Sequence, residues 1–411
     1  MSGLAPGARV TRALVLRSLA ALRGGEVVLT LPGGEVRHLG DSAGPSIAVE
    51  VRSDRIWTRL ARRTRVGLGE GFVAGDWDTP DLVGFFSLIV RNLDAAAERQ
   101  PLRSIYRVQE LRPHLPVRQT PERARESIHA HYDLGNDLFR LFLDESMTYS
   151  CAYWHSDEDT LEQAQRQKLE RICTKLGLGP DDHVLEIGCG WGSFALHAAS
   201  TRGCRVTAVT ISARQAELAR ERVAAAGLAD RVTVLEQDYR LLEGSFTRIA
   251  SIEMFEAIGL AEYETFFRTC DRLLAPDGLA CVQTIAIPDE RFERYRRTPD
   301  WIQQHIFPGS LLPSLESIAR ATARTRLMLH GVEEIGFGYA RTLREWRERF
   351  LSRLDEVRAL GYDERFVRTW LFYLGFCEAA FATRALRDVQ LVLTRSFNDS
   401  LPTLPTERIT F

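Results

Sequence analysis

One segment of the chain has residue types and spacing that indicate chemistry on a nucleotide-like ligand. Residues 184–196 read VLEIGCGWGSFAL, an apolar strand followed by Gly188, Gly190 and Gly192 at alternate positions and then a helix. A strand that enters a glycine turn and a helix N-terminus places bare backbone N–H groups beside such a ligand. A dinucleotide fold prefers G-x-G-x-x-G, with Asp or Glu closing the second strand. Here the second strand, residues 205–212, ends in hydroxyl residues, which argues against a dinucleotide.

The run E-x-G-x-G-x-G resembles instead the adenosylmethionine-binding turn of Rossmann-type methyltransferases. Its acidic residue, Glu186, is expected to order the glycine turn or to meet the methionyl amine through water. The alternative is a tight strand–helix turn that binds no ligand. The resemblance favours methyl transfer from S-adenosyl-L-methionine (SAM).

Length, cysteine content, charge and hydropathy argue against several other classes of function. A length of 411 residues allows two or three domains, each with its own core. Seven cysteines without a CxxC pair argue for a reduced cytosol, with neither a disulfide framework nor a zinc site. The net charge of −2 makes nucleic-acid binding unexpected, and His129, His131 and His155 form no metal triad. No apolar stretch approaches a membrane span and no leader is visible, so we expect a cytoplasmic protein, soluble or peripheral to a membrane.

The pattern of apolar residues predicts two domains joined by a linker. Residues 26–51 suggest a small antiparallel hairpin or sheet, a helix follows near 54–63, and 67–90 are a glycine-punctuated turn that ends in an apolar helix. This gives an N-terminal α+β domain over 1–100, and the proline-rich, charged residues 101–125 are interpreted as a linker. In the catalytic domain, 126–411, strands alternate with helices as a doubly wound α/β sheet requires. The candidate parallel strands are 184–188, 205–211, 231–237, 248–254 and 279–285.

Four further motifs indicate which class of substrate the protein acts on. They are HYDLGNDLFRLFLDESMTYSCAYW (131–154), SIEMFEAIG (251–259), QHIFPGSLLPS (304–314) and GFGYARTLREW (336–346). Together they resemble the cyclopropane-fatty-acyl-phospholipid synthase family, which includes the mycolic-acid cyclopropane synthases. The resemblance implies a class I SAM-dependent methyltransferase fold with a mixed seven-stranded sheet behind a small α+β N-terminal domain.

The chemistry of that family explains an aromatic-rich segment. An alkene attacks the sulfonium methyl of SAM, a carbocation forms on the acyl chain, and loss of a proton closes a cyclopropane ring. The site must exclude water and spread the positive charge, which aromatic faces do without offering a nucleophile. Core packing is the alternative role for each ring. The candidate rings are Tyr132, Phe139, Phe142, Tyr149, Tyr153 and Trp154.

The proton acceptor that the resemblance implies is a bound bicarbonate ion. Position by position, its contacts fall on the backbone N–H of Cys151, the carboxylate of Glu256, the hydroxyl of Tyr339 and the backbone of Ile285. An ion held by such donors in a dry pocket is a preorganised base. Cys151 is not expected to act as a nucleophile, because nothing near it in sequence lowers its pKa, and a buried structural thiol is its alternative role.

Two positions depart from the family pattern and leave the product open. Gln283 and Ala257 stand where cyclopropane-forming members carry His. Glutamine can donate a hydrogen bond to an anion, but it cannot relay a proton. Loss of a proton without ring closure would leave an exocyclic methylene, a precursor of 10-methyl fatty acids, and this product would call for a reductase partner.

The remaining cofactor contacts are also implied by the resemblance. Asp238 resembles the acidic residue that many methyltransferases direct at the adenine amine, and an ordinary strand-end cap is its alternative role. The other implied contacts are Tyr149, Ser150, Gly188, Gly190, Thr210, Ile211, Gln215 and Tyr239.

A phospholipid acyl chain lies inside a bilayer, so the expected enzyme must dock on the inner face of the membrane. Residues 81–90 could enter the interface and the arginine cluster 290–297 could pair with phosphate; a core helix and a solvated charged face are the alternatives. Residues 366–386 form a helix that must be buried, by packing or against an acyl tunnel. The resemblance assigns residues 1–100 to lipid presentation or to contact within a homodimer. Two less favoured functions remain: a small-molecule methyltransferase and a non-catalytic lipid-binding protein.

Overall fold

A computed structural model describes residues 6–92 and 134–402. They form two compact units, which are described separately. One unit joins the N-terminal residues to Arg297–Ile306 and Trp346–Ala385, and the other holds the remaining described residues from 134 onward. Segments late in the chain therefore belong to both units. The predicted boundaries at 100 and 125, the linker 101–125, His129, His131 and Tyr132 lie outside the described residues.

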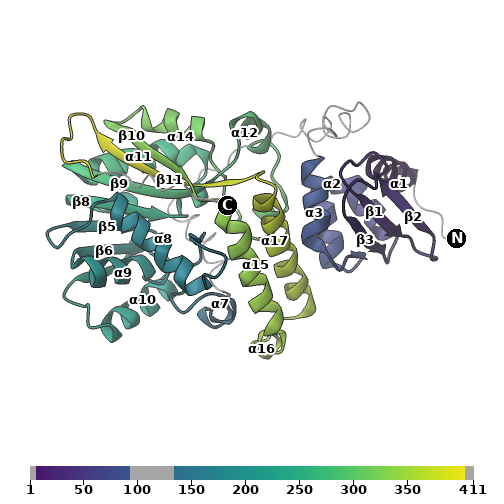
Figure 1. Ribbon diagram of the computed structural model, residues 1–411, viewed down its shortest axis with the longest axis horizontal. Helices are drawn as coiled ribbons and strands as arrows, with labels where there is room; N and C mark the ends of the chain where they lie inside the picture. The colour runs from purple at the N-terminus through teal and green to yellow at the C-terminus, as the bar shows by residue number, and fades with distance from the viewer. Residues whose placement is uncertain (1–5, 93–133, 403–411) are drawn as a thin grey trace. The chain divides into compact units, whose positions relative to one another are not determined.

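The larger unit is built on a seven-stranded mixed sheet with the order β10-β11-β9-β8-β5-β6-β7 (Figure 1). The five strands predicted to be parallel are parallel, and β11 pairs antiparallel with both β9 and β10. This confirms the expected Rossmann-type α/β sheet. The strands are β5 (His183–Ile187), β6 (Arg205–Thr210), β7 (Val232–Glu236), β8 (Phe246–Ile252), β9 (Leu274–Ala286), β10 (Leu327–Glu334) and β11 (Arg387–Arg395).

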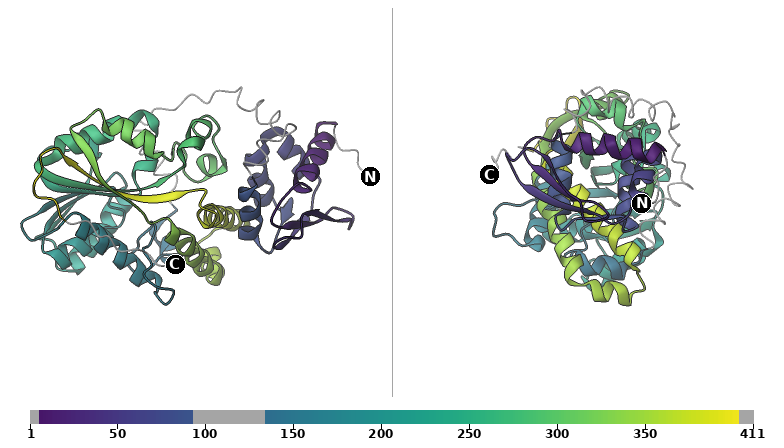
Figure 2. Two further views of the ribbon diagram at one scale, coloured as in Figure 1. Left: turned by 45° about the horizontal axis from the view of Figure 1, so that its top comes forward. Right: turned by 90° about the vertical axis from the view of Figure 1, so that its right-hand side faces the viewer.

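Helices cover both faces of this sheet (Figures 1 and 2). On one face lie α8 (Leu161–Lys175), α9 (Ser193–Arg202) and α10 (Ala213–Ala225), and on the other lie α11 (Tyr263–Leu273) and α14 (Leu315–Thr322). Successive strand residues alternate between the two cores: Val184 packs with the first set of helices and Leu185 with the second. The other helical segments of this unit are α7 (Asn136–Phe142), η1 (Tyr239–Leu241), η2 (Phe255–Ala257), η3 (Leu260–Glu262), α12 (Asp289–Tyr295) and the start of α15 (Phe337–Ser352).

The smaller unit contains a four-stranded sheet with the order β2-β1-β3-β4. The predicted antiparallel hairpin is formed by β1 and β2, whereas β3 pairs parallel with β1, so the hairpin alternative is confirmed and the sheet that contains it is mixed. The reason is that the chain crosses over through residues 41–45 before it joins the free edge of β1. The elements are α1 (Pro6–Leu19), β1 (Glu26–Thr30), β2 (Val36–Gly40), β3 (Ser46–Val51), α2 (Arg55–Val73), β4 (Trp77–Asp78), α3 (Leu82–Arg91), α13 (Trp301–His305), α16 (Leu354–Ala359) and α17 (Glu364–Ala382).

The glycines of residues 67–71 lie in a helix and not in the predicted turn. Helix α2 is kinked at Thr64, where φ is +38°, and continues to Val73. A Cβ on Gly67 would lie 2.5 Å from the carbonyl oxygen of Arg59, and one on Gly69 would lie 2.4 Å from the ring of Trp301. These glycines are therefore needed for close packing, which overrides their low helix propensity.

The apolar segment 81–90 is a core helix in this unit. Phe85, Phe86, Leu88 and Val90 are buried on α3. The ring of Phe86 packs edge-on against Phe372 and Phe376 of α17. Since the apolar face of α3 is covered by α17, core packing accounts for this segment and for the predicted helix at 366–386.

Across residues 6–92 and 134–402, no helix combines the length and the apolar character needed to cross a membrane.

We predict that Gly67→Ala destabilises the protein by about 1–3 kcal/mol, because the added methyl group forces the backbone at Arg59 to move. Thermal unfolding monitored by circular dichroism measures the change. Gly7→Ala is the control, because Gly7 lies in α1 and a methyl group added there would have no atom within 4 Å, so this variant should be neutral or slightly stabilising. An unchanged melting temperature for Gly67→Ala would contradict the packing role.

Candidate active site

The glycine turn after β5 has the backbone that its sequence requires. Gly188, Gly190 and Gly192 have φ values of +81°, +51° and +84°, a region that other residues avoid. The N–H groups of Gly188 and Cys189 donate to the carbonyl oxygen of Val209 on β6, which fixes the turn against the neighbouring strand. A Cβ on Gly190 would meet no atom within 4 Å, so this part of the turn faces open space.

The strand before this turn carries Glu186, one of whose carboxylate oxygens is without a hydrogen-bond partner among the described residues. It is buried on β5, where the backbone N–H of Ala195 contacts its carboxylate, and its Oε2 has no hydrogen-bond partner among the described residues. Burial raises the pKa of Glu186 to about 8. An acceptor without a partner beside an open glycine turn fits the ammonium group of SAM. The residues present therefore fit this cofactor, and Glu186 would both order the turn and face the amine.

The end of β6 lies beside the glycine turn, and three of the residues predicted to contact the cofactor lie there or shortly after it in sequence. Thr210 Oγ1 donates to Gln215 Oε1 at 2.7 Å, and Ser212 caps α10 by accepting from the N–H of Gln215. Ile211 is partly buried between them. These contacts place the three predicted residues Thr210, Ile211 and Gln215 together at the carboxyl edge of the sheet, where ligands of open α/β sheets bind.

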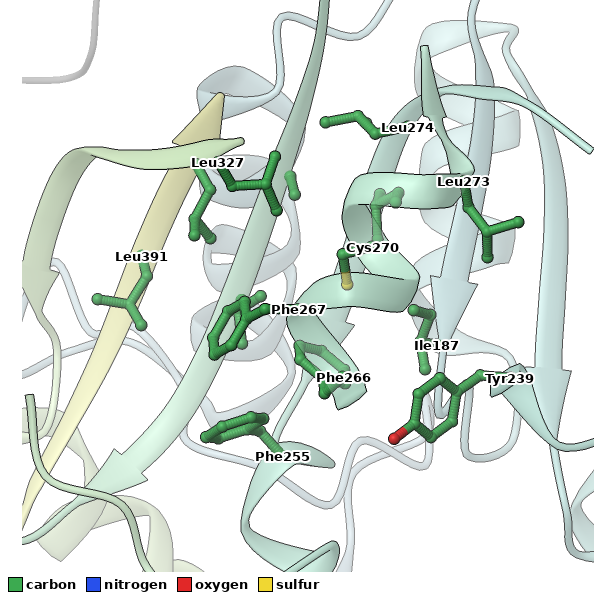
Figure 3. Close-up of a cluster of buried hydrophobic side chains, with 14 of the residues drawn as sticks. Ile187, Tyr239, Phe255, Phe266, Phe267, Cys270, Leu273, Leu274, Leu327 and Leu391 are labelled. Carbon is green, nitrogen blue, oxygen red and sulfur yellow. The ribbon is translucent and has the colours of Figure 1, made fainter. Parts of the chain in front are cut away.

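Asp238 is engaged within the chain. Its Oδ1 accepts from the backbone N–H of Arg240, which caps η1, and the Arg240 guanidinium also pairs with it at 2.6 Å. The cap is thus present in the structure, while the adenine contact stays a prediction. Tyr239 is buried against Phe266, and its hydroxyl has no hydrogen-bond partner among the described residues (Figure 3).

The segment before α8 brings Tyr149 and Ser150 to the same edge. Asp144 accepts from the N–H groups of Ser146 and Thr148 and so fixes the loop. From α8, Lys168 Nζ donates to Ser150 Oγ at 2.7 Å. Lys168 is fully buried, so α8 contributes a charged group to the interior beside this loop.

Three of the five predicted catalytic residues take part in one hydrogen-bonded cluster, which centres on Glu253. The backbone N–H of Cys151 donates to Glu253 Oε1 at 2.7 Å, and Gln283 Nε2 donates to the same oxygen at 2.8 Å. The Tyr339 hydroxyl donates to Glu253 Oε2 at 2.5 Å. Sequence reasoning missed Glu253, although its place directly after β8, at the carboxyl edge of the sheet, was a usable signal.

Glu256, the predicted catalytic carboxylate, lies beside this cluster. Its Oε1 accepts from the backbone N–H of Ile285 at 2.6 Å, and its Oε2 has no hydrogen-bond partner among the described residues. The structure thus pairs Ile285 with Glu256, whereas Cys151, Tyr339 and Gln283 surround Glu253.

The turn that carries both glutamates is anchored in the core. Phe255, between them in sequence, packs among Phe266, Phe267 and Tyr263 of α11 (Figure 3). Met254, the residue before Phe255, lies against the glycine turn, because a Cβ on Gly188 would be 2.5 Å from its side chain. The glutamate cluster is therefore next to the glycine turn.

If Glu253, Glu256, Asp388 and Lys168 were all ionised, the cluster would carry more negative than positive charge. Burial raises the pKa of Glu256 to about 8, helped by the charge of Glu253, and it raises the pKa of Asp388 well above its ordinary range. Burial lowers the pKa of Lys168, although the neighbouring acidic groups oppose this. The arrangement nearest to neutrality keeps Lys168 and one carboxylate charged and the other two acids protonated. Burial also raises the pKa of Cys151 well above its ordinary range, so the thiol is neutral.

Two of the candidate cation-stabilising rings already hold a guanidinium group. Arg171 lies 4.5 Å from the ring centre of Tyr153, and Arg341 lies 3.8 Å from that of Trp154. Their contacts are structural. Phe139, Phe142 and Tyr149 pack against one another, and Phe139 also packs against Trp191 of the glycine turn.

The sheet order, the glycine turn and the buried Glu186 define a class I SAM-dependent methyltransferase fold. The family model described as "Mycolic acid cyclopropane synthetase" matches residues 119–391. The chain belongs to this family, and it is an enzyme of the methyltransferase type.

Individual relatives agree with this assignment. The chain is 38% identical to tuberculostearic acid methyltransferase UfaA1 of Mycobacterium tuberculosis over 89% of its length and 87% of that protein. It is 39% identical to the cyclopropane-fatty-acyl-phospholipid synthase of Escherichia coli K12, over 86% and 89% of the two chains. The crystal structure of mycolic acid cyclopropane synthase CmaA1 complexed with SAH and CTAB superposes with a TM-score of 0.62 and 31% identity, covering 68% of this chain and 99% of that one.

We predict that Gly190→Ala lowers the affinity for SAM at least tenfold, because its methyl group enters the open side of the turn. Titration calorimetry measures the binding. Gly227→Ala is the matched control: Gly227 also has a positive φ, +66°, and no neighbour within 4 Å, but it lies beyond α10. Both variants should lose about 1–2 kcal/mol of stability. Equal affinities for the two variants would contradict the assignment of the turn.

The raised pKa of Glu256 predicts a pH-dependent stability. Between the ordinary value of 4.5 and about 8 the folded state binds a proton that the unfolded state releases, so stability falls as pH rises through this window. Glu256→Gln imitates the protonated acid and keeps the acceptor for Ile285. We therefore expect it to be more stable than wild type by about 2–4 kcal/mol at pH 9, with the difference vanishing towards pH 4.5. Urea unfolding across pH measures this, with the exposed Glu217→Gln as the control; a constant difference would refute it.

Proposed function

We propose that the protein transfers the methyl group of SAM to the cis double bond of an unsaturated acyl chain in a phospholipid, and that proton loss then closes a cyclopropane ring. The observation that carries this proposal is the pair of carboxylates, Glu253 and Glu256, beside the glycine turn. A carboxylate held by N–H and O–H donors accepts a proton, while the neutral Cys151 thiol offers no competing nucleophile. The similarity to a tuberculostearic acid methyltransferase and to a cyclopropane-fatty-acyl-phospholipid synthase supports a lipid substrate.

The residues of the site would have different roles in the reaction. Glu186 would hold the ammonium group of SAM, and SAM supplies an electrophilic methyl group when bound. The alkene donates its π electrons to this methyl, and the resulting carbocation must lose a proton to a base. The base that the family resemblance implies is bicarbonate, bound at Cys151, Glu256, Tyr339 and Ile285.

The second candidate product is a 10-methylene acyl chain, the precursor of a 10-methyl branch. Gln283 favours it, because its amide donates to both Glu253 and Asp388 and accepts from Gln390. Such an amide orients a carboxylate but carries no proton away. A methylene product would next require a reductase that delivers hydride, so a reductase partner belongs to this alternative.

The substrate also sets where the protein must act. A phospholipid acyl chain is reached from the membrane surface, so we expect a cytoplasmic protein that docks peripherally on the inner face. Lipid presentation or homodimer contact remains our hypothesis for the N-terminal unit.

We predict that the purified protein moves labelled methyl from SAM into vesicles of oleoyl phospholipid, and not into vesicles of saturated phospholipid. Scintillation counting of extracted lipid measures the transfer. Proton NMR then separates the products, since cyclopropane and vinylidene hydrogens resonate apart although both products have the same mass. Equal labelling of saturated vesicles, or turnover only with water-soluble acceptors, would refute the lipid assignment.

A further inference from the structure

Within the described part of the chain, the hydrogen-bond donors that surround Glu253 are already committed to it or to its neighbour. The Cys151 N–H and the Tyr339 O–H each have one hydrogen, and both donate to Glu253. The two amide hydrogens of Gln283 go to Glu253 and Asp388. A carboxylate and a bicarbonate ion present the same planar pair of oxygens, so one set of donors cannot hold both. The donors that the resemblance assigns to bicarbonate therefore hold a side chain of the chain itself.

The backbone is strained to put the carboxylate there. Glu253 has φ of +49°, a conformation that costs a non-glycine residue free energy and that clusters at functional sites. Its N–H donates to the carbonyl oxygen of Gln283, which holds the residue in this conformation. As a whole residue Glu253 keeps some exposed surface, unlike its neighbours Glu256 and Asp388, although its carboxylate lies within the buried cluster. The positive φ and the hydrogen bonds together fix the carboxylate of Glu253 at this position.

We propose that Glu253 is the resident base of the reaction, standing in the position of the bicarbonate ion, so that catalysis by this protein needs no added bicarbonate. This rests on the proposed function. The alkene π pair forms the new C–C bond as the S–CH₃ bond breaks and its electrons stay on sulfur. The carbocation then loses a proton from the added methyl to Glu253, and the C–H pair closes the ring or forms the methylene. Protonated Glu253 returns its proton to solvent after the product leaves.

The surrounding charges suit a base at this position. Lys168 is buried beside the cluster and balances an ionised Glu253, and Gln283 steadies the carboxylate from β9. Burial raises the pKa of Glu253, which strengthens it as a proton acceptor, while Tyr339 and the Cys151 N–H limit the rise. Asp388, protonated by its own burial, adds no competing charge.

Bicarbonate binding, measured without turnover, tests whether Glu253 or an external ion occupies the donors of this cluster. We call this place the anion position. The probe is ¹³C-labelled bicarbonate, titrated with protein and followed by ¹³C NMR line broadening. Wild type and Glu253→Gln should cause no saturable broadening. Glu253→Gly, which relieves the positive φ and vacates the donors, should bind bicarbonate, and the further change Tyr339→Phe should weaken that binding at least tenfold.

The role as a base is tested by activity. With oleoyl phospholipid vesicles in buffer freed of carbon dioxide, wild type should keep at least half of its rate in bicarbonate. Glu253→Gln should lower kcat at least 100-fold in either buffer, with SAM affinity within threefold of wild type. Glu253→Gly should be equally slow in bicarbonate-free buffer and should regain at least tenfold in rate when bicarbonate is added.

Each outcome decides one claim. Saturable binding of bicarbonate by wild type, or loss of nine-tenths of the wild-type rate without it, would overturn the proposal, as would an active Glu253→Gln. If wild type methylates no lipid in either buffer, the proposed function fails and the base role fails with it. The NMR titration still decides separately whether Glu253 or an external ion occupies the anion position.

Discussion

A carboxylate removed from water must be matched by donors, and this requirement ties the larger unit together at Glu253. The donors come from the segment before α8, from β9 and from the start of α15, while Lys168 on α8 balances the charge. Losing one donor would leave a charged oxygen unsatisfied, which costs about 1–3 kcal/mol or more. The position of each of these elements is therefore coupled to the others through one ionised group.

The mixed sheet makes this meeting possible. Parallel β5, β6 and β8 bring their carboxyl ends to one edge, which carries the glycine turn, the Thr210 segment and the glutamate turn. The antiparallel β11 then places Gln390 directly opposite Gln283, and the two amides share a hydrogen bond of 3.0 Å. The same register sets Asp388 opposite Ile285. A wholly parallel sheet would not have placed these polar residues beside Gln283.

Both lysines of the chain are buried in the larger unit and bond to polar groups there. Lys168 donates to Ser150, and Lys175 donates to Gln390 and pairs with Glu333. Both are buried, whereas all the other basic side chains of the sequence apart from histidine are arginines. A lysine ammonium is compact and points its hydrogens in several directions. An arginine at either position would bring a larger, permanently charged group, so the choice of lysine has a physical reason that composition alone does not reveal.

The sequence by itself determined the α/β fold and the glycine turn, because strand periodicity and motif spacing are local properties. The resemblance of its motifs to a known family then implied Cys151, Gln283, Ile285 and Tyr339 as site residues. The sequence could not place the glycines of α2 in a helix or pair β3 parallel with β1, since both depend on contacts distant in the chain. It also passed over Glu253 in favour of Glu256, three residues away. Only the tertiary structure decided which carboxylate receives the donors, because the direction of a side chain after β8 is set by one positive φ and by residues from three other elements.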